Sequence, residues 1–154
     1  ITGPRKEVIA DHDRVAASLA RGSKNSNVET ELVYVPNGGS AKSYKDIDVK
    51  GKIVISEGNV RSIFSAAVNS FGAAGALSYE VRYPERYPDM LVWSSVRPGK
   101  NTQGGFGFQI SYTKGRELIA QLKRGKKITV HADVETKVYP GKLDVVTGLI
   151  PGTD

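Results

Sequence analysis

A strand–helix–strand pattern over residues 52–79 constrains this chain more than any other feature. Residues 52–56 form a short apolar run, which predicts a buried strand. Apolar side chains recur at a spacing of four over residues 60–74, which predicts an amphipathic helix, and residues 76–79 follow as a second short strand. Such a βαβ unit pairs its two strands in parallel. We therefore expect a mixed α/β domain.

Weaker patterns flank this unit. Helices are predicted over residues 13–20 and 113–123, and strands over 29–35 and 108–110. Residues 127–139 alternate strictly between apolar and polar, which is typical of a half-solvated antiparallel strand, and residues 142–150 are its expected partner across a Pro140-Gly141 turn. The predicted fold is thus one α/β domain over residues 1–154. It has a small mixed sheet or open barrel, a βαβ core, an antiparallel C-terminal hairpin and two or three flanking helices.

Residues 80–107 form a long irregular stretch that carries the candidate binding residues. It contains the tandem tetrads Arg82-Tyr83-Pro84-Glu85 and Arg86-Tyr87-Pro88-Asp89, whose prolines exclude a helix. A loop of this length in a compact domain is often functional, and arginine and aromatic residues are typical of contact surfaces. The candidate surface for substrate or partner comprises Arg82, Tyr83, Arg86, Tyr87, Trp93, Arg97 and Phe106.

A second interpretation of the aromatic residues stays open. Trp93 and Phe106 would then be core residues, and we favour this interpretation for Trp93 because residues 91–93 resemble a strand. For Tyr83 and Tyr87 the two interpretations carry equal weight. If the loop is a binding surface, both tyrosines should be clearly exposed.

The sequence offers no plausible catalytic set. It has no cysteine and two histidines, of which His131 lies on the polar face of its predicted strand and is expected to be solvated or paired across strands. Asp11-His12-Asp13 is a dense group of possible metal ligands, but adjacent side chains diverge, so we favour capping of a helix by an aspartate. We expect this chain to be no enzyme by itself, with no catalytic residue, metal or cofactor of its own.

Charge and hydropathy exclude other classes of partner. The net charge is +6, yet the densest basic cluster, residues 123–127, has no aromatic neighbour and fits a helix C-terminus better than a nucleic-acid surface. The apolar runs are far shorter than the ~20 residues of a membrane span, and no signal peptide is found. We expect both ends to be boundaries within a longer polypeptide.

Three segments in the right order resemble the protease-associated domain. They are residues 46–58, residues 71–79, and residues 108–111 with Gly115, Leu118, Leu122 and Gly125. The resemblance covers about residues 28–138 and implies a swivelling β/α fold without catalytic residues. The sequence departs from the family at Glu57, where an arginine is common.

Residues 142–154 resemble the strand that opens the catalytic domain of co-catalytic-zinc aminopeptidases. The resemblance implies a parent zinc metallopeptidase that is secreted, periplasmic or on the cell surface. In that parent, this domain would cover the active-site cleft and influence peptide access or protein recognition. Its partners would be the catalytic domain of the same polypeptide and peptide or protein substrates, and the zinc would belong to the catalytic domain. The alternative is a freestanding or receptor-borne peptide- or protein-binding module.

Overall fold

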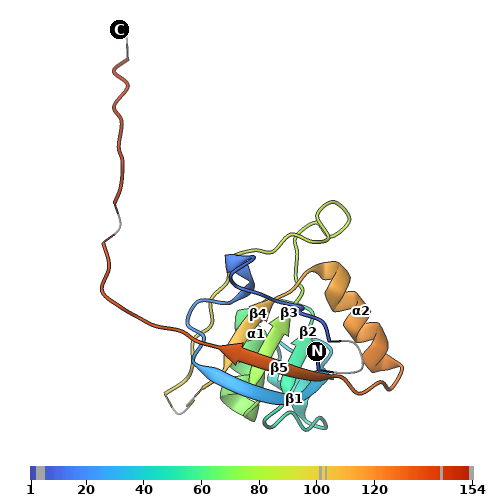
Figure 1. The fold of residues 1–154 in the computed structure, drawn as a ribbon. Helices are drawn as coiled ribbons and strands as arrows, with labels where there is room; N and C mark the ends of the chain where they lie inside the picture. The colour runs from blue at the N-terminus through green and yellow to red at the C-terminus, as the bar shows by residue number, and fades with distance from the viewer. Residues whose placement is uncertain (3–5, 101, 103, 143, 153–154) are drawn as a thin grey trace.

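The protein folds around one five-stranded sheet in the order β4-β3-β2-β1-β5 (Figure 1). The structure is a computed structural model that describes residues 1–2, 6–100, 102, 104–142 and 144–152. The strands are β1 (Ser26–Tyr34), β2 (Ile53–Ser56), β3 (Gly75–Ser78), β4 (Phe106–Gln109) and β5 (Thr129–Val134). The mixed α/β fold predicted from the sequence is confirmed.

The βαβ unit forms as expected. β2 and β3 pair in parallel, with Val54 opposite Ala76, and β4 continues the parallel sheet on the far side of β3. All four residues of β2 are buried because the sheet is covered on both faces: Ile53 and Ile55 face one apolar cluster and Val54 the other. This two-sided burial explains the continuous apolar run in the sequence.

β1 curls the sheet into a half-barrel. Its first part pairs antiparallel with β5, from Ser26 opposite Val134 to Glu31 opposite Thr129, and its last three residues pair in parallel with β2. The predicted alternation over residues 127–139 is confirmed within β5, whose even-numbered side chains are buried. The predicted C-terminal hairpin is wrong: β5 pairs antiparallel with β1, and the described residues of 142–150 form no strand.

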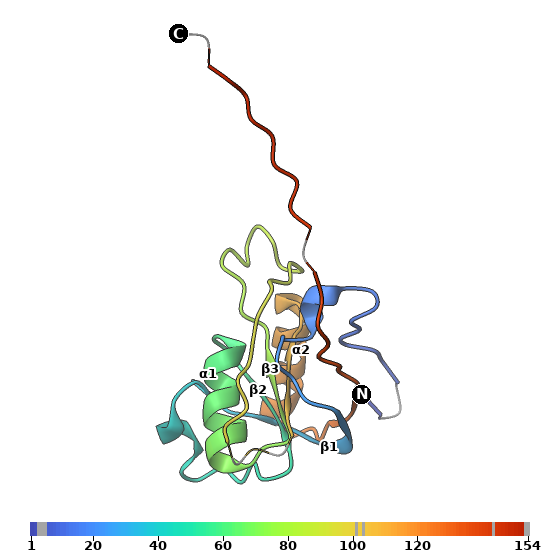
Figure 2. The same cartoon turned by 90° about the vertical axis from the view of Figure 1, so that its left-hand side faces the viewer.

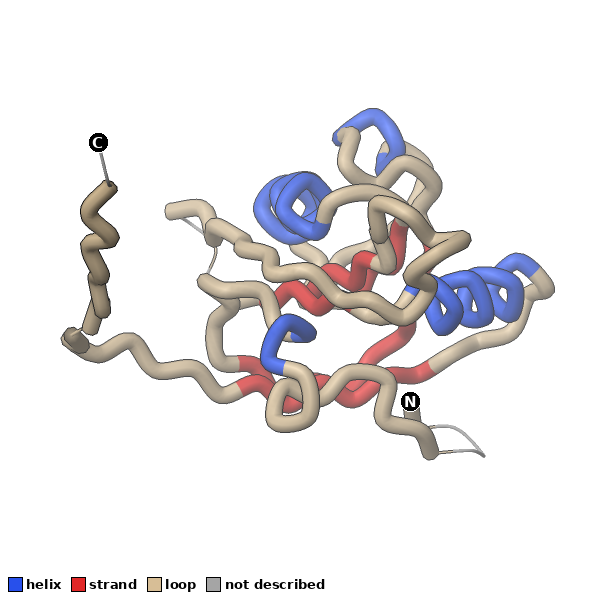
Figure 3. The backbone as a smooth tube through the Cα atoms, turned by 90° about the horizontal axis from the view of Figure 1, so that it is seen from above, coloured by secondary structure: helices blue, strands red, loops and turns tan. Residues whose placement is uncertain are grey.

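Helices cover the sheet on different sides (Figure 2). α1 (Val60–Phe64) continues as the π-helical segment η3 (Ser65–Ser70) and packs with the 3₁₀ turn η2 (Ala41–Tyr44) on one face. Seen from above, β1 and β5 lie across β2–β4 from α1 (Figure 3). The interior of the curl holds a second apolar cluster, which α2 (Tyr112–Lys123) closes through Leu118 and Ile119.

Local signals set the ends of both helices. The Asn59 side chain accepts the N–H of Arg61 at 2.9 Å at the start of α1, and Ser111 accepts the N–H of Lys114 at 3.2 Å at the start of α2. Helical structure after α1 ends before the predicted residue 74, because Gly72 adopts a φ of 71° and turns the chain into β3.

The helix predicted over residues 13–20 is wrong. Its described remnant is the 3₁₀ turn η1 (Ala16–Ser18), whose N-cap Val15 makes no side-chain capping bond. Leu19 instead bridges Phe108, and Ala20 donates its N–H to the carbonyl of Gly107 at 2.8 Å. Pairing with the exposed edge of β4 satisfies these backbone groups and overrides the local helical pattern.

Candidate functional site

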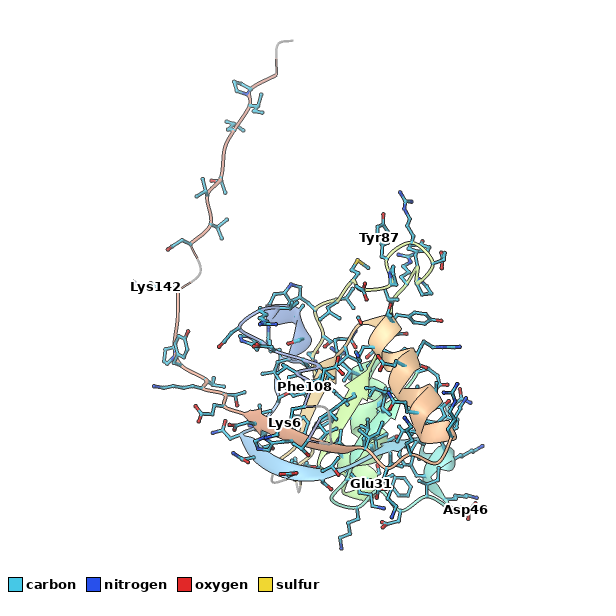
Figure 4. The ribbon with its side chains drawn as sticks, turned by 45° about the vertical axis from the view of Figure 1, so that its right-hand side comes forward. Lys6, Glu31, Asp46, Tyr87, Phe108 and Lys142 are labelled. Carbon is cyan, nitrogen blue, oxygen red and sulfur yellow. The ribbon has the colours of Figure 1, made fainter. Side chains whose placement is uncertain are left out.

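The seven candidate residues do not form one surface. Arg82 to Tyr87 lie on the tip of a loop that projects beyond β3, where Figure 4 labels Tyr87. Tyr83 is 48% exposed and Tyr87 42%, which confirms the expected exposure. The guanidinium carbon of Arg82 lies 5.4 Å from the centre of the Tyr83 ring, and that of Arg86 lies 5.2 Å from the centre of the Tyr87 ring. The loop therefore displays two exposed cation–π pairs.

The positions of two aromatic residues differ from what the sequence suggested. Phe106 begins β4, is 1% exposed and packs edge-on against Phe108, so it belongs to the core and leaves the candidate surface. Trp93 is 75% exposed, and residues 91–93 form no strand, so the favoured core interpretation is wrong. Val96 fills the nearby core position instead, because its backbone pairs with Arg21.

Trp93 and Arg97 line a groove of about 1590 Å³, which we call the cationic groove. Its walls come from four separated stretches: residues 12–25, the start of α1, residues 93–97 and residues 136–138. Residues of η1 and of the start of the C-terminal tail line it, and in Figure 1 these two segments lie across the molecule from α2.

Backbone hydrogen bonds hold these walls together. Arg21 donates its N–H to the carbonyl of Ser94 at 3.0 Å and accepts the N–H of Val96 at 2.8 Å. Gly22 has a φ of 91°, and a Cβ there would lie 2.3 Å from the Val96 carbonyl oxygen, so the close approach requires glycine. Thr136 ties the fourth stretch on, because its hydroxyl donates to the carbonyl of Ser23 at 3.2 Å.

The groove is strongly basic. Its exposed cationic side chains are Arg21, Lys24, Arg61, Arg97 and Lys137, and the His12 ring also lines it. Among the described residues, no aspartate or glutamate lines the groove, and none of the five lysines and arginines is within 4.0 Å of a carboxylate. Sequence reasoning found Arg97 and missed the other four, because they lie far apart along the chain and no local pattern links them.

A second polar cluster lies where the parallel strands end, the edge at which open α/β sheets commonly bind ligands. The Tyr34 hydroxyl donates to Glu57 Oε1 at 2.7 Å, and the Ser78 hydroxyl donates to the carbonyl of Gly58 at 2.6 Å. Burial opposes ionisation of Glu57, but hydrogen bonds from Tyr34 and Ser56 outweigh it and lower its pKa. These groups satisfy one another, so the cluster anchors the turn at Glu57, the position that departs from the resembled family.

The histidines are engaged locally. His131 Nε2 lies 3.0 Å from Asn27 Oδ1 across the β1–β5 pair, which confirms the cross-strand interpretation. His12 Nδ1 lies 3.7 Å from Asp13, and Asp11 accepts the N–H of Asp13 at 3.0 Å in a turn rather than as a helix cap. Over the described part of the chain, no three side chains of the kind that hold metals gather.

The C-terminal tail, residues 137–142 and 144–152, runs away from the folded body in an extended form (Figures 1 and 2). It carries exposed apolar side chains, with Val146 98%, Leu149 91% and Ile150 94% exposed. Leu143, which the alternation over residues 142–150 places on one strand face with Val145, Thr147 and Leu149, lies outside the described residues. Apolar rows of this kind are typical of a segment that packs against another structure.

Comparison with known proteins shows the fold. No protein-family model and no curated protein matches the sequence. Among solved structures, the chain is similar to an aminopeptidase from Aneurinibacillus sp. strain AM-1, with a TM-score of 0.54 and 24% identity over 75% of this chain. It is also similar to a peptidase M28 precursor from Shewanella amazonensis SB2B, with a TM-score of 0.55 and 11% identity over 75% of this chain. At these identities the similarity establishes the fold alone.

The chain spans 26% of the aminopeptidase and 30% of the peptidase precursor. It therefore has the fold of a fragment of two larger peptidases. Within the described residues, no helix is long and apolar enough to cross a membrane.

Proposed function

We propose that this chain is a non-catalytic protease-associated domain of a larger zinc aminopeptidase that is secreted, periplasmic or on the cell surface. There it covers the active-site cleft and influences which peptides reach it. The observation that carries the proposal is the likeness to just 26% and 30% of two peptidases, which leaves most of each outside the matched fold. In this proposal the zinc belongs to the catalytic domain.

The tail supports attachment to a second domain. Its exposed apolar side chains lie beyond β5 and in the segment whose sequence resembles the first strand of an aminopeptidase catalytic domain. A strand of this composition is stable when a neighbouring sheet buries it. The cationic groove lies at the base of the tail, since Lys137 and Val138 line it. A catalytic domain attached through the tail would thus lie near the groove.

The test is kinetic and uses the longer protein. A variant in which a short linker replaces residues 26–134 should retain turnover of a single aminoacyl chromogenic substrate. Its kcat/KM for longer peptides should rise relative to its kcat/KM for the single aminoacyl substrate, because the domain that covers the cleft is removed. Unchanged relative rates for long and short substrates would contradict the proposed cover.

Two controls separate the alternatives. The 154-residue chain alone, incubated with zinc and the same substrates, should show no turnover above the blank, and clear turnover would make this chain an enzyme. The coding sequence past Asp154 should contain a strand followed by a histidine and an aspartate. A membrane span or a stop in its place would favour the freestanding or receptor-borne binding module, which the exposed Trp93 also suits.

A further inference from the structure

We propose that the cationic groove binds acidic peptide segments through their carboxylates. This inference rests on the proposed function, because it names the class of peptide that the domain would admit or recognise. The binding itself is a property of this chain and can be measured without the catalytic domain.

The charge of the groove selects an anion. Arg21, Lys24, Arg97 and Lys137 are exposed, and their side chains make no hydrogen bond or ion pair with any described residue. Some cations elsewhere on the surface are paired, as Lys52 is with Asp48 and Glu31 and Lys114 with Glu7 and Glu117, and others are not. The groove differs because five lysines and arginines line one concave surface that has no carboxylate among its described lining residues. A concave surface lined by positive charges concentrates the local electrostatic field and attracts carboxylates.

Arg61 supplies an oriented donor on one wall. It follows the N-cap of α1, and its guanidinium donates to the hydroxyl of Ser95 and to the Ser95 carbonyl, the latter from Nε at 3.4 Å. These bonds fix the plane of the guanidinium while Nη1 stays free of described partners. A guanidinium held in this way is suited to paired hydrogen bonds with a carboxylate.

Size and aromatic content favour a peptide over other anions. The volume of about 1590 Å³ exceeds the ~300–1,000 Å³ typical of small-molecule sites, so an extended segment fits better than a single small acid. Trp93 offers exposed apolar area beside the cations, and tryptophan with arginine is the usual composition of peptide and protein contacts. A single-stranded nucleic acid needs several stacking rings along its track, whereas the described lining of the groove offers Trp93 and only the smaller imidazole ring of His12 beside it.

The experiment uses Trp93 as its own probe, because it is the single tryptophan of the chain. A blocked glutamate-rich peptide is titrated against the 154-residue chain, alongside the same peptide with glutamine in place of each glutamate. We expect a saturable change in Trp93 emission with the glutamate peptide alone. Binding should weaken as salt rises from about 50 to about 200 mM, because screening shortens the reach of exposed charges.

Charge-removing variants locate the site. Arg97→Gln and Lys24→Gln should each weaken binding by up to about fivefold, the range set by exposed charge pairs. Lys126→Gln with Lys127→Gln is the matched control: it also removes positive charge, but beyond α2 on the other side of the molecule, and should leave affinity within about twofold. All four side chains are exposed, so folding is preserved.

Several outcomes would overturn the inference. One is an equal response to the glutamine peptide, and another is equal weakening by the control variant. Tighter binding of a single-stranded oligonucleotide at the same salt would assign the groove to nucleic acid. A change in Trp93 emission with protein concentration, together with a doubled mass, would assign it to a second copy of the chain. In each of these cases the kinetic test of the longer protein still decides the proposed function separately.

Discussion

Gly115 provides the sharpest test of how α2 packs against the sheet. It lies within α2, where alanine in place of glycine ordinarily stabilises a helix by about 1 kcal/mol. In this fold, however, a Cβ at Gly115 would lie 2.3 Å from both Cβ and Cγ of Tyr79, which is buried at the end of β3. The structure therefore predicts that Gly115→Ala is destabilising, against the helix propensity.

The magnitude follows from the overlap. Carbon atoms in contact ordinarily lie about 3.5–4.0 Å apart, so α2 and Tyr79 would have to separate by more than about 1 Å. The Tyr79 Cβ is fixed to its backbone and cannot rotate away, so the whole helix must shift. Overpacking of this kind costs about 1–3 kcal/mol, and a shift of a helix lies at the upper end. After the gain in helix propensity, we expect a net loss of about 2 kcal/mol in the free energy of unfolding.

Urea unfolding followed by far-ultraviolet circular dichroism measures this loss as a lower midpoint at unchanged m-value. Ala120→Gly, at an exposed position of the same helix, calibrates the propensity and should cost about 1 kcal/mol. In a Tyr79→Ala background the ring is gone but the Cβ remains 2.3 Å from the added methyl group, so Gly115→Ala should be less destabilising than in the unmodified chain. A Gly115→Ala protein more stable than the unmodified chain would refute the packing of α2 on Tyr79.

Three further predictions address the core, the phenols and the tail. Phe106→Ala should cost about 3–5 kcal/mol, whereas Trp93→Ala should change the free energy of unfolding by less than about 0.5 kcal/mol, because one ring is 1% and the other 75% exposed. Urea midpoints measure both, and equal costs would contradict the assignment of core and groove. Burial raises the pKa of Tyr44 from its ordinary value near 10 to about 12. The folded state therefore gains stability from the neutral phenol at pH values below 10, and this gain is lost as the pH rises toward 12. Tyr44→Phe should cost about 1 kcal/mol near pH 8, through loss of its bond to the Gly38 carbonyl, and should flatten the decline near pH 11. Brief trypsin treatment should cleave at Lys142 in the exposed tail before the folded body, as mass spectrometry would show, and earlier cleavage within the sheet would contradict the fold.

Local patterns predicted the parallel core well. The apolar run of β2, the spaced apolar residues of α1 and the start of β3 each carry a complete signal within a few residues, and the structure forms all three. The alternation in β5 is also local, so its buried and exposed faces were predictable. The partner of β5 was not, because an alternating strand pairs equally well with any free edge of the right polarity.

The sequence predicted only part of the candidate site, because local patterns do not show which distant segments come into contact. The exposed tetrads near Tyr87 are a feature of consecutive residues, and composition pointed to them directly. The cationic groove joins Arg21, Arg61 and Lys137 from stretches distant in sequence, and their meeting depends on backbone pairing between residues 21–24 and 94–96. No periodicity in the sequence encodes that contact.

The sequence by itself determined the buried strands and the amphipathic helix of the βαβ unit and the alternating burial of β5. Tertiary structure alone decided that Phe106 is core while Trp93 is exposed, although both are aromatic residues of one irregular stretch. Burial of a single side chain depends on which distant backbone pairs beside it: β3 takes β4 into the sheet, whereas Arg21 pairs with Ser94 and Val96 and leaves Trp93 outside.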